Sequence, residues 1–182
     1  MTLEEYRQRD TSFDEVTFIT KVNNIVIKFF NSITLNELKK VDHFVADKVY
    51  ETGCRIAKEA EDKGNIHMFD EVNIRSSSIN NITEDGEAYY MYVSMNLLYM
   101  DYIMNKDTGN VVMGDNNNRT SHPMTMVFKK YKHATEQNLV RTCPTCGASL
   151  NTNNTGVCEY CHSVYDQEDH DWVLVDIQGF NY

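Results

Sequence analysis

The chain has 182 residues with a formal net charge of −10, and 41% of them are hydrophobic, which suits one globular domain with its own core and a small added module. The acidic surface repels phosphate groups, so we expect no nucleic acid partner. Every apolar run is shorter than the roughly 18 residues of a membrane-spanning helix, which predicts no transmembrane segment. The opening segment lacks signal-peptide character, which predicts a cytoplasmic protein.

The charged opening segment, residues 1–12, is predicted to be an N-terminal tail. A helix is predicted over about 13–32, because apolar residues recur there at helical spacing. Ser12 and Glu15 form a capping-box pattern that we expect to start this helix. Its apolar residues are numerous enough that other elements should cover most of its surface.

Two further helices are predicted before the chain becomes extended. Thr34 and Glu37 form a second capping-box pattern, which predicts a short helix that ends near Val41. Asp42 is expected to cap a third helix, which ends near Gly64 because glycine is a common C-terminal stop.

A hairpin of two strands is predicted next. Alternating apolar and polar residues predict a strand over 71–83, and Asp85-Gly86 is a hairpin-turn sequence. The second strand, 87–104, has apolar and aromatic residues in both alternating sets of positions. Such a strand is expected at the centre of a sheet, with helices covering one of its sides.

The remaining chain is predicted to complete an antiparallel sheet. A turn at Asp107–Gly109 leads to a short strand over 110–114, a loop over 115–122 and a strand over 123–134. The last strand is expected at 171–178. Helices followed by a meander of strands predict the α+β class, with the N-terminal helices packed on one antiparallel sheet.

Four cysteines near the end of the chain form the most specific motif. Cys143 and Cys146 are one CxxC pair, and Cys158 and Cys161 are another. Two intervening residues let each pair direct both sulfurs to one point, which predicts a tetrahedral Zn²⁺ site with four thiolate ligands. Four thiolates leave no open position, so the zinc is expected to be structural, and iron could occupy the same geometry. Cys54 is expected to be a small packed thiol.

Other interpretations of the cysteines explain fewer residues. Cys158, Cys161 and His162 match a haem-attachment motif, but that motif needs export and leaves the first cysteine pair without a role. A redox CxxC pair would accompany a βαβ pattern, which the sequence does not show. His162 could replace one cysteine ligand, but its position directly after Cys161 favours a neighbour of the site.

The metal-binding segment is expected to interrupt the sheet without breaking it. Residues 141–165 would form an inserted zinc ribbon, and residues 13–140 together with 166–182 would form the main domain. The strands on either side of the ribbon, Val127–Lys132 and Trp172–Gln178, could then pair as antiparallel neighbours.

Four segments carry a family resemblance: FDEVTFITKVNNIVIKFF (13–30), LNELKKV (35–41), DWVLVDIQ (171–178) and the ribbon CPTCGASLNTNNTGVCEYC (143–161). Together they resemble the bacterial branch of the Tim44-like domain family. The resemblance implies the cone-shaped fold of the nuclear-transport-factor-two superfamily, with a curved antiparallel sheet around a pocket and a zinc ribbon inserted before the last strand. It also implies a non-enzymatic role in protein–protein contact and peripheral membrane attachment, although this chain lacks a basic amphipathic N-terminal segment.

Two functions are predicted, in order of preference. The first is a binding or scaffold module with a protein partner, because no convincing catalytic constellation is visible. The alternative is a cone-fold protein that binds a hydrophobic ligand or acts as an isomerase or cyclase, by fold analogy alone. In that alternative Asp101 would be the base, with Tyr99 and Tyr92 lining the pocket. The pair Asp42–His43 is expected to be a helix cap rather than a site.

Overall fold

The computed structural model describes residues 1–132, 146, 148, 158, 160–162 and 172–182. In chain order the elements are helices α1 (Leu3–Arg9) and α2 (Glu15–Thr34), the 3₁₀ turns η1 (Leu38–Lys40) and η2 (Asp42–Phe44), helix α3 (Asp47–Glu61), and strands β1 (Asn65–Glu84), β2 (Ala88–Asn105), β3 (Val111–Tyr131) and β4 (Val173–Gln178).

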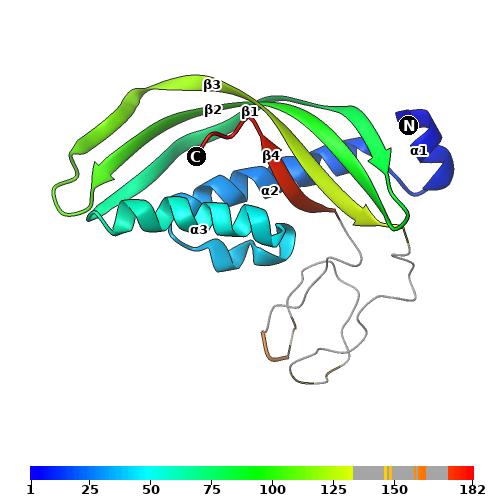
Figure 1. Ribbon diagram of the computed structural model, residues 1–182, viewed down its shortest axis with the longest axis horizontal. Coiled ribbons are helices and arrows are strands. Elements are labelled where there is room, and N and C mark those ends of the chain that lie inside the picture. The colour runs from blue at the N-terminus through cyan, green and yellow to red at the C-terminus, as the bar shows by residue number, and fades with distance from the viewer. Residues whose placement is uncertain (133–145, 147, 149–157, 159, 163–171) are drawn as a thin grey trace.

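The four strands form one antiparallel sheet in the order β1-β2-β3-β4. The sheet is curved, and α2 and α3 lie against its concave side, which we call the inner face (Figure 1). The predicted α+β class, with N-terminal helices packed on a curved antiparallel sheet, is confirmed.

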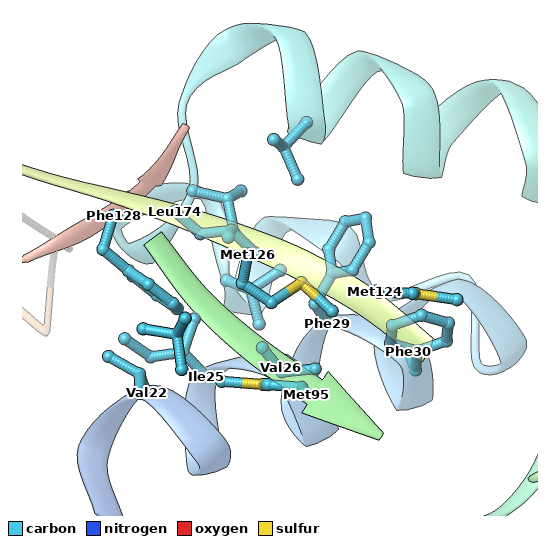
Figure 2. Packing of buried hydrophobic residues seen from close by; sticks show 14 of the residues in the cluster. Val22, Ile25, Val26, Phe29, Phe30, Met95, Met124, Met126, Phe128 and Leu174 are labelled. Atoms are coloured by element: carbon cyan, nitrogen blue, oxygen red, sulfur yellow. The ribbon is translucent and has the colours of Figure 1, made fainter. Parts of the chain in front are cut away.

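Helix α2 supplies one side of the hydrophobic core, because its apolar residues recur on the face that meets the sheet. Phe29 and Phe30 of this helix are fully buried, as are Met91 on β2 and Met126 on β3. Figure 2 shows aromatic rings and thioethers from the helix and the strands interleaved in one cluster. The two methionines therefore fill the core, since flexible thioethers fit irregular gaps between rings.

Helix α1 lies within the segment that the sequence predicts as a tail. Thr2 Oγ1 accepts a hydrogen bond from Glu5 N at 3.2 Å, and Glu5 Oε2 accepts one from Thr2 N at 2.6 Å. Tyr6 is fully buried, and its ring packs edge-on against Phe13 and Tyr89. One buried ring thus fastens α1 to the domain, and the Thr2–Glu5 capping box is the sequence signal that indicates the helix.

Helix α2 confirms the helix predicted over about 13–32, but its N-cap is Asp14 rather than Ser12. Asp14 Oδ1 accepts from Thr17 N at 2.7 Å. The Ser12 hydroxyl instead donates to Asp10 Oδ1 at 2.6 Å. Asp10 is the C-cap of α1. The Ser12 hydroxyl is therefore bonded to the end of the preceding helix, and Asp14 caps α2 in its place.

The next two predicted helix starts are wrong. Thr34 is the last residue of α2, and its hydroxyl accepts from Phe69 N at 2.9 Å. The short helix expected there is the 3₁₀ turn η1. Helix α3 begins after its N-cap Ala46, whereas Asp42 lies in η2. The reason is tertiary, because Ala46 N donates to Leu174 O at 2.9 Å and the chain is extended at that point.

Both predicted hairpin turns are present. Asp85 N donates to Ala88 O at 3.0 Å between β1 and β2, and Asn105 N donates to Asn110 O at 2.8 Å between β2 and β3. Strand β3, however, continues through residues 115–122, where the sequence predicts a loop. That prediction of a break between two separate strands is wrong.

The pairing of β3 with β2 is nevertheless interrupted in this segment. The ladder passes from the Thr120–Tyr99 pair directly to the Asp115–Asp101 pair. Residues 116–119 therefore lie opposite the single residue Met100 and form an irregular bulge in an otherwise continuous strand. The asparagine-rich sequence that suggested a loop coincides with this bulge, since asparagine tolerates irregular backbone conformations.

Strands β3 and β4 pair antiparallel, as predicted, although the cysteine-bearing segment separates them in sequence. Val127 pairs with Asp176, and Phe128 pairs with Leu174. The division of the chain into a main domain and a separate ribbon over 141–165 stays a prediction, because most of that segment lies outside the described residues.

Candidate functional site

Three of the predicted metal ligands come together in the structure. We call Cys146, Cys158 and Cys161 the cysteine cluster, and their sulfur atoms all lie within 4.8 Å of one another. Cys158 is buried, whereas the other two are exposed. His162 N donates to Cys158 O at 2.9 Å, which closes the turn that brings Cys161 back towards Cys158. The fourth predicted ligand, Cys143, lies outside the described residues.

The sulfur positions fit a tetrahedral metal site. The sulfurs of Cys146 and Cys158 are 3.8 Å apart. Two ligands of a tetrahedral zinc with Zn–S bonds of about 2.3 Å are separated by roughly 3.8 Å. A disulfide between these two sulfurs would need a separation of about 2.05 Å. The donor set and its spacing therefore favour metal coordination over a bond between these two cysteines.

A second group of polar residues lies on the inner face of the sheet. We call His67, Asp101 and Tyr182 the inner-face cluster. Asp101 Oδ1 is 2.9 Å from His67 Nε2, and Asp101 Oδ2 accepts a hydrogen bond from the Tyr182 hydroxyl. The His67 ring stacks on Phe69, with centroids 4.5 Å apart. The carboxylate thus has a partner at each oxygen, inside a largely aromatic environment.

The strand register explains why these residues meet. Phe69 pairs with Asp101, and His67 pairs with Ile103, so all four residues point to the same face of the β1–β2 hairpin. Alternation along β1 is a sequence signal that could have placed His67 beside Phe69. No local signal indicates Tyr182, because its contact with Asp101 depends on the pairing of β4 with β3.

One of the two predicted pocket tyrosines belongs to this face. Tyr99 is almost fully buried two residues before Asp101, and burial with the nearby carboxylate raises the pKa of its hydroxyl. Its ring stacks on His122 at a centroid distance of 4.0 Å. Burial lowers the pKa of His122, and the Asp101 carboxylate partly opposes this. Tyr92 is an odd number of positions from Asp101, so it lies on the opposite face of the sheet.

The remaining candidates lie elsewhere. Asp42 and His43 form a pair at 3.2 Å in η2, not the cap of α3. Cys54 on α3 is partly buried against the core, which confirms the expected packed thiol. His67 also lines an open cleft of about 320 Å³ between the end of α2 and the start of β1, with Thr34 and Lys106 on its other walls.

The sequence pattern of the Tim44-like domain family matches residues 1–139. The chain belongs to the Tim44-like domain family. A comparison with curated proteins finds no match. In the part of the chain that the structure describes, no helix is long and apolar enough to cross a membrane.

The Tim44-like match covers the helices and the first three strands but ends before the cysteine cluster. Strand β4 and the cysteine cluster both follow residue 139. Family membership therefore supports the domain and its general role, whereas the metal site rests on the cysteines themselves.

Proposed function

We propose that this Tim44-like domain is a non-enzymatic binding or scaffold module that contacts a protein partner. Its membership of the family over residues 1–139 carries the proposal, because Tim44-like domains are associated with protein interactions. Peripheral contact with a membrane would then occur through that partner, because a net charge of −10 opposes direct binding to anionic lipids.

The proposal includes a structural zinc ion held by the cysteine cluster together with Cys143. Thiolate sulfurs are preferred zinc ligands, and four of them leave no position for a substrate or a reactive water. Zinc binding would contribute free energy to the folding of residues 141–165, which are too few for a core of their own. Thiolate ligands must stay reduced, so the proposal places the chain in the cytoplasm.

Two measurements test the proposal. Affinity capture from extract with the full chain as bait should enrich a protein partner over an unrelated bait of similar charge, and recovery of background proteins alone would contradict the binding role. Native mass spectrometry of the purified chain should find one zinc ion for each chain. Iron in place of zinc would show a visible thiolate-to-iron absorption band, and metal-free protein would overturn the metal site.

A second candidate is a ligand-binding or enzymatic cone with Asp101 as the base. The contact of Asp101 with His67 favours it, because imidazole–carboxylate pairs are common in acid–base sites. Against it, the second carboxylate oxygen is occupied by the Tyr182 hydroxyl. A stoichiometric small molecule retained in native mass spectrometry, and lost in Asp101→Asn, would favour this candidate over the binding module.

A further inference from the structure

The inner face holds a short segment of the chain against side chains of α2, α3, β1 and β2, and we call this contact surface the pocket. We propose that this pocket is a peptide-binding site, that residues 179–182 (the latch) occupy it in cis, and that a partner peptide with two aromatic residues at positions i and i+2 binds in their place. The inference rests on the proposed protein-binding function and names the chemistry of the partner.

The latch leaves the sheet at a defined point. The β3–β4 ladder ends with the pair Thr125–Gln178. Gly179 then adopts a φ of 88°, and a Cβ there would lie 3.2 Å from Pro123 O, so a side chain would be strained at this turn. The turn directs the latch beneath the sheet, where the end of the chain lies on the side of the helices (Figure 1).

Two aromatic rings of the latch fill the pocket. The Phe180 ring packs against Phe30 and Phe69, with centroid distances of 5.3 and 6.1 Å. The Tyr182 ring packs edge-on against Phe69 at 5.6 Å and against His67 at 5.3 Å. These T-shaped and tilted contacts are the preferred geometry of aromatic pairs, so the pocket selects rings rather than aliphatic side chains.

Polar contacts fix the second aromatic position of the latch and its backbone. The Tyr182 hydroxyl donates to Asp101 Oδ2. Arg55 Nη2 donates to the backbone carbonyl of Tyr182 at 2.7 Å. A carboxylate acceptor at the ring tip favours tyrosine over phenylalanine, and the guanidinium adds a charge-assisted hydrogen bond to the backbone of that residue. The pocket therefore selects an aromatic residue, any residue and then a tyrosine.

The latch is held less firmly than the pocket that receives it. Phe30 and Phe69 belong to α2 and β1, and they pack on each other and on Tyr99, so contacts outside the latch hold both rings. Tyr182 is 42% exposed, and the latch has no ladder partners after Gln178. A partner peptide could replace the latch without unfolding the sheet. The net charge of −10 favours a peptide with basic flanking residues.

Peptide binding to an opened pocket tests the inference. The variant is the full chain with Phe180→Ala and Tyr182→Ala, and the probe is a labelled synthetic peptide with the sequence of residues 174–182. The double variant should bind the peptide in a 1:1 ratio and at least tenfold more tightly than the wild type, in which the latch competes. A peptide with phenylalanine at its last position should bind on the order of tenfold more weakly. A peptide with alanine at both aromatic positions should not bind.

Several results would overturn the inference. One is a double variant that keeps the wild-type circular dichroism spectrum and cooperative unfolding but does not bind the peptide. Another is equal binding of the aromatic and alanine peptides. If the double variant does not fold, Tyr182→Ala alone keeps Phe180 in the pocket and should bind the peptide a few-fold more tightly than the wild type. No difference between that variant and the wild type would also count against the latch.

The test separates this inference from the proposed function. A double variant that binds the peptide, with no protein captured by either chain, would support the pocket and contradict the wider binding role. The opposite outcome is that both chains capture a protein equally well and the double variant does not bind the peptide. That outcome would support the binding role and overturn the pocket.

Discussion

In the cysteine cluster, two of the three sulfurs belong to exposed residues, yet they lie within 4.8 Å of each other and of the third. In the inner-face cluster, His67 and Asp101 lie 2.9 Å apart on paired strands, above rings that are almost fully buried. The three sulfurs of the first arrangement could hold a metal ion, and the proposed zinc would fix their positions. The second arrangement is fixed by strand pairing and by the packing of the core.

The two clusters are therefore expected to depend on different features: the cysteine cluster on its metal ligands, and the inner-face cluster on core packing. Loss of a ligand should dismantle the cysteine cluster and leave the domain folded. Loss of core packing should destabilise the domain, together with the inner-face cluster.

The largest effect is expected from Cys158→Ser. A serine hydroxyl is a poor ligand for zinc, so bound metal should fall from one ion for each chain to nearly none, as measured by native mass spectrometry. The urea unfolding transition followed by Trp172 fluorescence should remain cooperative, because Trp172 is buried in the main core. Cys54→Ser is the matched control and should retain the metal. Full metal occupancy in Cys158→Ser would contradict the cysteine site.

Phe30→Ala is expected to lower the stability of the domain and leave the metal content unchanged. Phe30 is fully buried and contacts Phe69 and Tyr99, so its removal leaves a cavity beneath both strands of the inner-face cluster. The free energy of unfolding should fall by about 3–5 kcal/mol in urea titrations, with metal content unchanged in the folded protein. Val16→Ala on the same helix is the control, because Val16 is 75% exposed and its loss should change the free energy by at most about 0.5 kcal/mol. A loss below about 1 kcal/mol for Phe30→Ala would show that the core can close over the gap.

Gly114→Ala tests whether the sheet register fixes Asp101. Gly114 has a φ of 87°, and a Cβ there would collide with the backbone carbonyl of Asp101. A strained residue of this kind costs about 1–3 kcal/mol, so thermal and urea stability should fall by that amount. Gly86→Ala is the control, since nothing lies within 4 Å of a Cβ at that position. Equal stability of the two variants would mean that β3 can shift away from β2 at little cost.

The smallest effect is expected from Asp10→Asn, which removes the ion pair between the end of α1 and strand β3. Lys130 Nζ lies 2.9 Å from Asp10 Oδ2. Burial works against ionisation of Asp10, but hydrogen bonds from Ser12 and Lys130 outweigh it and lower the pKa of the carboxyl. The resulting stabilisation is present above the unfolded pKa of about 3.9 and is lost as the pH falls through the lower folded value. In urea titrations between pH 5 and 2.5, Asp10→Asn should lose less stability than the wild type. Asp107→Asn, at an exposed turn, should follow the wild-type curve.

The same two clusters show what could be predicted before the fold was known. Cys158 and Cys161 are three positions apart, and Cys146 is only twelve positions before Cys158. Spacing that short constrains the sulfurs directly, so the motif predicts its own geometry. His67 and Asp101 are 34 positions apart, and Tyr182 is 81 positions beyond Asp101. Contacts over such distances depend on strand register and on how the end of β4 turns.

The helices and strands also show which features local sequence signals predict and which features long-range contacts determine. Periodicity over 13–32 predicted α2, because that signal lies within the helix itself. Alternation over 71–83 and two turn sequences predicted the order of the β1–β2–β3 meander, although β1 begins earlier, at Asn65, and β3 lacks the predicted break. The start of α3 was decided by the bond from Ala46 to Leu174, and the continuity of β3 was decided by its pairing with β2. By itself the sequence determined the α+β class and the cysteine motif. Only the tertiary structure decided that Asp101 meets His67 and Tyr182, since side chains far apart in sequence are brought together by the packing of whole elements.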